Sequence, residues 1–172
     1  IGGANSISSP KDLAPFVTCM NLSAAHVQIE DIKKMATALN FINLNRLELH
    51  ENEFFGGRSL EYLTQGNWPK LSYLDLSFTG VDDEALLILT RGKWPLLETF
   101  YLQGTKITSL GVETIVNQTN WLQLKALNLS YNYLGDEGIR ILSQGNWPQL
   151  EILHLEEVKI TSIGIEAIIK KW

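Results

Sequence analysis

Cysteine is nearly absent from this sequence of 172 residues, because Cys19 is the only one. A disulfide bond within the chain is therefore excluded. The net charge of −5 excludes a general affinity for nucleic acid or for an anionic membrane. No window of 18 apolar residues occurs, so the sequence predicts no membrane-spanning helix. No signal peptide is visible at Ile1, and we expect the chain to begin inside a longer protein or after processing.

A fixed internal period dominates what the sequence does contain. An apolar residue returns in steps of 26 or 27 residues, at Val17, Leu44, Leu71, Leu97, Leu124 and Leu150. An aromatic residue returns in similar steps, at Phe41, Trp68, Trp94, Trp121 and Trp147. Hydrophobic residues make up 45% of the chain, which is enough for one continuous core. The sequence therefore predicts six stacked units of one kind.

The segment from Leu124 to Leu134 shows the repeat most clearly, with leucines at the first, fourth and sixth positions and Asn132 at the ninth. It resembles the leucine-rich repeat, whose core is Leu-x-x-Leu-x-Leu-x-x-Asn/Cys-x-Leu. The resemblance extends from about Pro15 to the C-terminus, and the repeat length is similar to that of the ribonuclease-inhibitor-like and cysteine-containing classes. The chain departs from the cysteine class at the ninth position, which holds Ala25, Asn52, Thr79, Thr105, Asn132 and Val158. The Gly-Asn-Trp-Pro segments are loosely similar to repeats of bacteria that live inside amoebae and other host cells.

The resemblance implies an α/β solenoid in which parallel strands line a concave face and helices cover the convex face. Strands about 4.8 Å apart cannot match helices about 8–10 Å apart, so we expect the stack to curve. We assign residues 13–172 to one domain of six repeats. Residues 1–12 are small and polar and predict a linker or N-terminal arm, although they could instead continue an upstream repeat. The first helix of the repeats is expected from about Glu30 to Leu39.

The repeated aromatic and polar residues have mainly structural interpretations. We expect the tryptophans to form a ladder at the edge of the core, with an aromatic binding row as the alternative. Asn52 and Asn132 are expected to hydrogen-bond the turning backbone, as are Thr79 and Thr105 more weakly. Acids and hydroxyls at the predicted helix starts are expected to cap them; these are Asp82, Asp83, Glu84, Thr108 or Ser109, Asp136, and Thr161 or Ser162.

The strand positions between the leucines point away from the core, because successive side chains of a strand alternate. Counting from the first leucine of each repeat, the third-slot row is Cys19, Arg46, Tyr73, Thr99, Ala126 and Ile152. The fifth-slot row is Asn21, Glu48, Asp75, Tyr101, Asn128 and His154. The seventh-slot row is Ser23, His50, Ser77, Gln103, Ser130 and Glu156. The eighth-slot row is Ala24, Glu51, Phe78, Gly104, Tyr131 and Glu157.

An aromatic centre with an acidic rim on these rows predicts a protein interface, since aromatic residues anchor many interfaces. We expect the partner to be a protein with basic residues. The predicted contact residues are Arg46, Glu48, Tyr73, Asp75, Phe78, Tyr101, Asn128, Tyr131, His154 and Glu156. We interpret the chain as a non-catalytic interaction module or scaffold within a larger protein. The alternative is a substrate-recognition domain of a ubiquitin ligase.

The lack of cysteine-rich end caps, which extracellular leucine-rich repeat proteins usually carry, favours an intracellular location. This would be the cytoplasm, or a host cell if the loose bacterial resemblance holds. The sequence leaves the oligomeric state open.

Catalysis, metal binding and cofactors are not expected. Ser23, His50 and Ser77 share one row, but no oxyanion donors accompany them, so a small hydrolase is the weakest alternative. His50 and His154 are expected to lie four strands, about 19 Å, apart, which is too far to share a zinc ion. No phosphate-binding glycine loop occurs, since Gly56-Gly57 lacks the following lysine.

Overall fold

The computed structural model describes residues 10–52, 56–118 and 121–172, in which strands and helices alternate along the chain. The strands are β1 (Cys19–Asn21), β2 (Arg46–Glu48), β3 (Tyr73–Asp75), β4 (Thr99–Tyr101), β5 (Ala126–Asn128) and β6 (Ile152–His154). The helices are α1 (Pro10–Leu13), α2 (Ile29–Ala38), α3 (Gly57–Gln65), α4 (Asp83–Leu89), α5 (Ser109–Val116), α6 (Gly135–Gln144) and α7 (Ser162–Lys171), and the 3-10 helix η1 (Ala14–Phe16) follows α1. Most of the predicted N-terminal arm lies outside the described residues, and α1 begins at Pro10, inside its predicted range.

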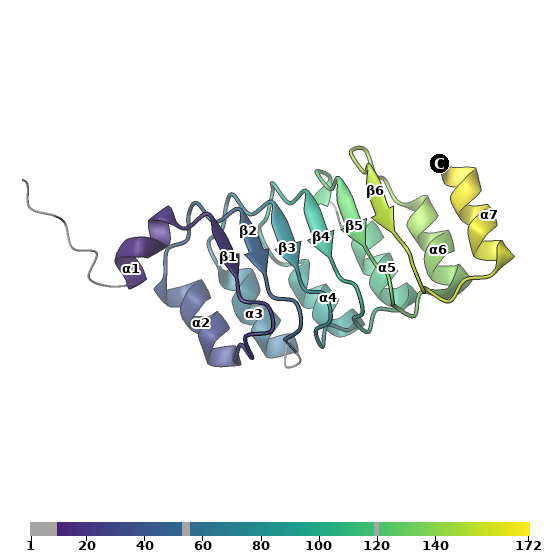
Figure 1. The fold of residues 1–172 in the computed structure, drawn as a ribbon. Helices are drawn as coiled ribbons and strands as arrows, with labels where there is room; N and C mark the ends of the chain where they lie inside the picture. Colours follow the sequence, from purple (N-terminus) through teal and green to yellow (C-terminus); the bar gives the residue numbers. More distant parts are fainter. Residues whose placement is uncertain (1–9, 53–55, 119–120) are drawn as a thin grey trace, which may run out of the picture.

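The six strands form one open parallel sheet in the order of the sequence. Figure 1 shows this sheet as one layer and helices α2 to α7 as a second layer behind it. The middle residue of each strand points into the space between the layers, and Leu47, Leu74, Phe100 and Leu127 are fully buried there. The predicted α/β repeat solenoid is therefore confirmed.

The tryptophan ladder lies inside the structure, as its position at the edge of the core predicted. Trp68, Trp94 and Trp121 are buried, while Trp147 in the last repeat is only partly covered. The glycine two residues before each of three tryptophans makes room for the indole. A β-carbon added to Gly66, for example, would lie 2.5 Å from the Trp68 ring. The Gly-x-Trp spacing is thus a packing requirement of the turn.

The buried asparagines bond the turning backbone, as predicted. In Asn132 the side-chain amide donates to the carbonyl oxygens of Leu102 and Leu129 at 2.7 and 3.0 Å. Its oxygen accepts from the backbone amide of Ile107 at 3.1 Å and from the hydroxyl of Thr105 at 2.9 Å. The residue therefore connects two adjacent repeats. Asn52 does the same in the first two repeats, and Thr79 bonds one carbonyl.

The helix starts confirm three of the predicted caps and correct one. The side chains of Asp82, Thr108 and Thr161 accept hydrogen bonds from backbone amides two or three residues further on. Asp136 was expected to cap its own helix, but it instead bonds Thr161 at the start of the next helix. Asp83 reaches Thr108 in the same way, at 2.9 Å to the backbone amide and 2.6 Å to the hydroxyl. These two aspartates join neighbouring helices.

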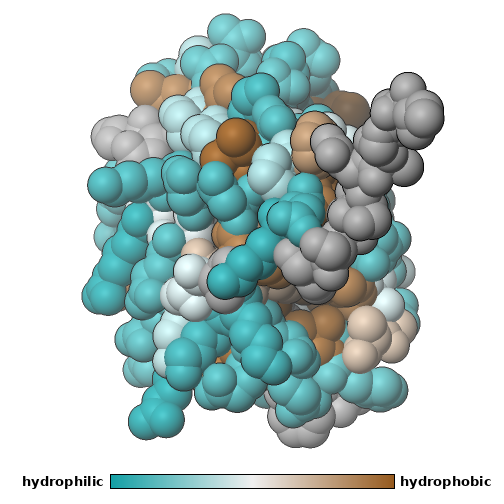
Figure 2. Space-filling model, turned by 90° about the vertical axis from the view of Figure 1, so that its left-hand side faces the viewer, coloured by the Kyte–Doolittle hydropathy of each residue, from teal (hydrophilic) through white to brown (hydrophobic). Residues whose placement is uncertain are grey.

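The two ends of the solenoid differ in character. Figure 2 shows the N-terminal end, where the surface is largely hydrophilic and hydrophobic patches are separate. Its exposed apolar side chains include Leu13 and Phe16. At the other end, α7 exposes Ile163, Ile165 and Ile169, and Trp172, which follows it, is exposed too. Throughout the described part of the chain, no helix has the length and apolar character that a membrane span requires.

Candidate protein-interaction face

The register of the sheet confirms the side-chain rows that the period predicted. Each strand pairs with the next without a slip, so Arg46 lies opposite Tyr73, and Tyr73 lies opposite Thr99. In the fifth-slot row, Asp75 lies opposite Tyr101. We call the surface formed by the third, fifth, seventh and eighth slots the strand face. This face lies on the side of the sheet away from helices α2 to α7.

An arginine and two tyrosines form the centre of the strand face. The rings of Tyr73 and Tyr101 meet edge to face, with 5.5 Å between their centroids. The Arg46 guanidinium lies 3.5 Å from the centre of the Tyr73 ring, which is a close cation–π contact. Its Nε also donates to Glu48 Oε1 at 2.6 Å. The structure thus brings together four predicted contact residues from three adjacent strands.

The electrostatics of this centre follow from its partial burial. Burial raises the pKa of the Tyr73 phenol to about 12, and the negative charge of Asp75 adds to the effect. Partial burial is the largest single influence on Arg46 and opposes its charge, but the hydrogen bond to Glu48, the Glu48 charge and the interactions with Tyr73 together outweigh it, and the pKa of Arg46 is raised. Tyr73 is therefore neutral and Arg46 is charged at every physiological pH. The centre therefore presents a charged guanidinium that lies over one tyrosine ring and is hydrogen-bonded to the Glu48 carboxylate.

Asp75 and Asn128 belong to the predicted set but are largely covered, with 7% and 8% of their surfaces exposed. Each side chain accepts a hydrogen bond at 2.9 Å from the backbone amide two residues later, on Ser77 and Ser130 respectively. Asn128 also donates to the Gln103 side chain at 3.1 Å. These bonds hold the chain as it leaves the strand. The two residues therefore support the face more than they extend from it.

The C-terminal side of the strand face carries a polar cluster. The Ser130 hydroxyl donates to the Glu156 carboxylate and accepts from the Glu156 backbone amide at 3.1 Å. His154 Nδ1 lies 3.6 Å from the other oxygen of Glu156. The hydrogen bond from Ser130 lowers the pKa of Glu156, so this carboxylate remains charged in mildly acidic solution. The predicted residues His154 and Glu156 are thus brought together.

Every eighth slot has a left-handed backbone, a feature that the sequence interpretation missed. The φ angle is positive at Ala24, Glu51, Phe78, Gly104, Tyr131 and Glu157. A left-handed conformation is unfavourable for residues with a β-carbon, and only Gly104 avoids this cost. Phe78 uses the space over Gly104, since a β-carbon there would lie 2.4 Å from its ring. Phe78 and Tyr131 remain 46% and 53% exposed.

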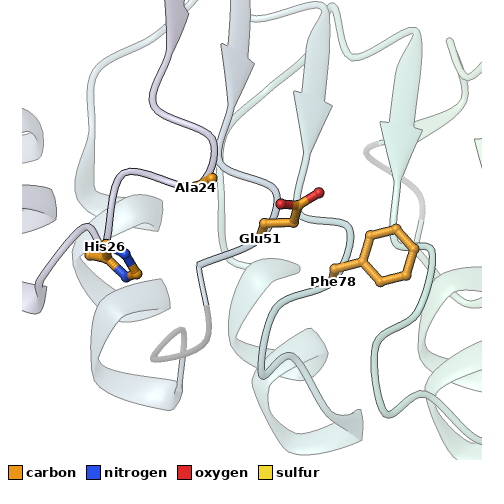
Figure 3. A pocket seen from close by; sticks show the side chains of 4 residues that line it. All are labelled: Ala24, His26, Glu51 and Phe78. Atoms are coloured by element: carbon orange, nitrogen blue, oxygen red, sulfur yellow. The ribbon is translucent and has the colours of Figure 1, made fainter.

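The turns after the first three strands line an open hollow of about 470 Å³. It is lined by Ala24, His26, Glu51 and Phe78. Figure 3 shows His26 and Phe78 at opposite ends, with the Glu51 carboxylate between them. Only Phe78 of these four was among the predicted contact residues.

The geometry does not assemble the catalytic relay that the serines and His50 suggested. The Ser23 hydroxyl lies 2.8 Å from Nδ1 of His50, and Asp75 lies 3.5 Å from the same nitrogen. In a serine–histidine–acid relay the serine and the acid contact opposite nitrogens of the ring. Ser77 is engaged elsewhere, because its hydroxyl accepts from the Gln103 amide at 3.3 Å.

Comparison with known proteins relates two of the repeats to a known family. The family described as "Leucine Rich repeat" matches residues 69–87 and 124–143, which are parts of the third and fifth repeats. The chain is similar to the C-terminal domain of tropomodulin from Caenorhabditis elegans, with a TM-score of 0.64, 10% identity, and coverage of 84% of this chain and 91% of that one. It is also similar to the structure of the actin-binding site 2 of leiomodin-1, with a TM-score of 0.53, 15% identity, and coverage of 93% and 81%. No curated protein sequence matches the chain. The loose resemblance to repeats of amoeba-associated bacteria finds no support in these matches.

Proposed function

Starting from a chain built of leucine-rich repeats, we propose that it is a non-catalytic module that binds a protein partner on its strand face. The observation that carries the proposal is the central cluster of Arg46, Tyr73 and Tyr101. Arginine and tyrosine are among the residues most enriched at positions that dominate binding energies. Here the register of the sheet places them on adjacent strands, where Arg46 contacts the Tyr73 ring and Tyr73 contacts the Tyr101 ring.

The pre-formed geometry of the cluster supports a binding role. Ordering a flexible side chain at an interface costs about 0.5–1.5 kcal/mol. Tyr73 and Arg46 are already ordered, because each contacts a neighbouring strand residue. Short strands in a continuous ladder also give a rigid platform. A partner would therefore meet a surface that needs little rearrangement.

The surroundings of the cluster support a partner with basic residues. Glu48, Glu51, Glu156 and Glu157 give the strand face a surplus of carboxylates, in keeping with the net charge of −5. Charge complementarity mainly raises association rates and selects among partners. Exposed Phe78 and Tyr131 extend the aromatic surface on the eighth-slot row. His154 and Asn128 complete the proposed contact set, Asn128 chiefly as a support.

The structural neighbours support the same class of function at the level of the fold. The leiomodin-1 structure is described as an actin-binding site, so a solenoid of similar fold serves protein binding in that protein. At 15% identity this likeness extends to the fold alone. A substrate-recognition domain of a ubiquitin ligase is the same binding role within a larger assembly, and an intracellular location suits both.

The test is a capture experiment followed by titration. Wild-type protein and the Tyr101→Ala variant serve as paired baits, and a partner retained only by wild type is then titrated against both. We expect Tyr101→Ala to weaken binding by about 2 kcal/mol, roughly 30-fold. Tyr133→Ala is the matched control, since Tyr133 is 68% exposed and lies outside the four rows. Its affinity should equal that of wild type.

A second comparison separates the two layers of the solenoid. Arg140→Glu alters the exposed surface of α6, where Arg140 pairs with Glu137 at 2.5 Å. If Arg140→Glu abolishes binding while Tyr101→Ala has no effect, the partner docks on the helices and the proposal is wrong. The double variant Glu156→Ala/Glu157→Ala should lose less affinity than Tyr101→Ala, and its loss should shrink as salt rises.

A further inference from the structure

The hollow beside Phe78 contains an unused carboxylate next to an exposed aromatic ring. The backbone ladder continues into the eighth-slot row, where the Glu51 amide bonds the Ser77 carbonyl at 3.0 Å and the Phe78 amide bonds the Gln103 carbonyl at 2.7 Å. Neighbouring parallel strands are about 4.8 Å apart, so the two side chains leave the backbone side by side. Figure 3 shows both at the rim of the same hollow.

The other carboxylates of the strand face are engaged, which sets Glu51 apart. Glu48 bonds Arg46, and Asp75 bonds the Ser77 amide. Glu156 bonds the Ser130 hydroxyl, and Glu157 bonds Lys159. Within the part of the chain that the structure describes, Glu51 has neither a cation nor a hydrogen-bond donor. Its carboxylate lies at the hollow, and no positively charged side chain of the described residues pairs with it.

Phe78 lines the hollow on the other side of Glu51, with its ring directed toward the next repeat. Its ring occupies the space over Gly104, where no β-carbon could fit. The ring is nevertheless 46% exposed. On the far side of Glu51, the small side chain of Ala24 leaves room, and His26 closes the hollow. The result is a recess of about 470 Å³ with one negative charge and one exposed ring.

We propose that this recess binds an arginine side chain of the protein partner. A guanidinium would give the Glu51 carboxylate a positively charged partner. It pairs with a carboxylate through two parallel hydrogen bonds, and it stacks against an aromatic ring. An ammonium offers neither the fork nor the plane, and an anion would be repelled. This inference rests on the proposed function and deepens it, because it states where on the strand face a basic residue of the partner binds.

A short peptide tests the recess without the partner. ¹⁵N-labelled protein is titrated with acetyl-Ala-Arg-Ala-amide, and amide shifts are followed by NMR. We expect the shifts to concentrate at Ala24, His26, Glu51 and Phe78. The peptide in which citrulline replaces arginine has nearly the same shape but no charge, and it should cause no saturable shifts. The lysine peptide should bind more weakly than the arginine peptide.

Two variants assign the roles of the carboxylate and the ring. Glu51→Gln keeps the shape of the side chain and should weaken the arginine peptide about fivefold, as should Phe78→Leu, which keeps an apolar wall without an aromatic face. Glu166→Gln is the matched control, because it removes an exposed carboxylate from α7, in the other layer of the solenoid, where Glu166 pairs with Lys170. The amide spectrum of each variant verifies that it is folded.

The proposal is overturned if Glu51→Gln binds like wild type, if citrulline or lysine binds as well as arginine, or if shifts spread equally over all acidic residues. These outcomes concern only the recess. The capture experiment with Tyr101→Ala addresses the central cluster, so a failure of the recess can be told apart from a failure of the proposed function.

Discussion

The carboxylate of Asp136 accepts hydrogen bonds from both the backbone amide and the hydroxyl of Thr161, at 2.8 and 2.7 Å. A third bond, 2.9 Å long, comes from the Gly164 amide. The side chain thus serves the first turn of the following helix. Because all three donors lie in the next repeat, Asp136 holds α6 and α7 together at their N-terminal ends.

This arrangement predicts a pH dependence of stability. The hydroxyl and amide of Thr161 lower the pKa of Asp136 in the folded protein. An ordinary aspartate has a pKa of about 4. Because the pKa of Asp136 is lower than this in the folded protein, its charge stabilises the fold at pH values above about 4, and the contribution is lost as the pH falls through the lowered pKa. Asp136→Asn should therefore reduce the free energy of unfolding at pH 7 and approach wild type in acid. Urea melts across this range measure it.

The control for this prediction is Glu166→Gln, which removes an exposed carboxylate of α7 that pairs only with Lys170 at 3.6 Å. Its stability should follow the wild-type pH curve. A constant difference between Asp136→Asn and wild type at every pH would mean that the charge of Asp136 does not contribute.

Gly164→Ala should destabilise the protein by about 1–3 kcal/mol, as overpacked sites do. The added β-carbon would lie 2.7 Å from Asp136 Oδ1 and 3.0 Å from the Ile160 β-carbon. Alanine otherwise favours a helix over glycine by about 1 kcal/mol, so a rise in the urea midpoint would contradict the prediction. Gly56→Ala is the control, because nothing lies within 4 Å of its added carbon.

Trp94→Ala should cost about 3–5 kcal/mol, the usual loss for a large aromatic side chain in a core. Trp94 is fully buried in the middle of the ladder. Trp172→Ala, at a side chain that is 55% exposed, should change the free energy of unfolding by less than about 1 kcal/mol. Equal effects of the two variants in urea melts would refute a structural ladder.

Asn132→Leu should cost at least about 3 kcal/mol, although leucine is the more hydrophobic residue. The substitution leaves the Ile107 amide and the Leu129 carbonyl without their Asn132 partner, at about 1–3 kcal/mol for each buried group, while the Leu102 carbonyl keeps only its bond from the Thr105 hydroxyl. Asn146→Leu, at an exposed asparagine between α6 and β6, is the comparison and should be close to neutral. An unchanged melting midpoint for Asn132→Leu would exclude the backbone role.

The sequence predicted the structure well at positions that recur at the same slot of every repeat. The period alone placed Tyr73 opposite Arg46, and the register of the sheet confirms that pairing. It also placed the tryptophans at the core edge and Asn132 at the turn. In each of these cases the deciding property, alternation along a strand or recurrence at a fixed slot, is local to the chain and is visible in the sequence.

Contacts between repeats were beyond the sequence. Asp136 looks like a cap for its own helix, because a first-turn aspartate usually is one, and only the packing of α7 against α6 brings Thr161 to it. The covering of Asp75 by its neighbours is equally non-local. Ser23 and Asp75 both contact Nδ1 of His50, and this depends on the rotation of the His50 side chain. The position of a residue within its repeat does not determine that rotation.

The left-handed eighth slots have a consequence for how such a chain can diversify. Their backbone is fixed by the ladder on either side, while their side chains leave the sheet and carry little of the core. The six occupants are accordingly unlike one another: alanine, glutamate, phenylalanine, glycine, tyrosine and glutamate. Apart from Gly104, which the Phe78 ring covers, substitutions along this row can change binding preferences one residue at a time, while the architecture that displays them stays the same.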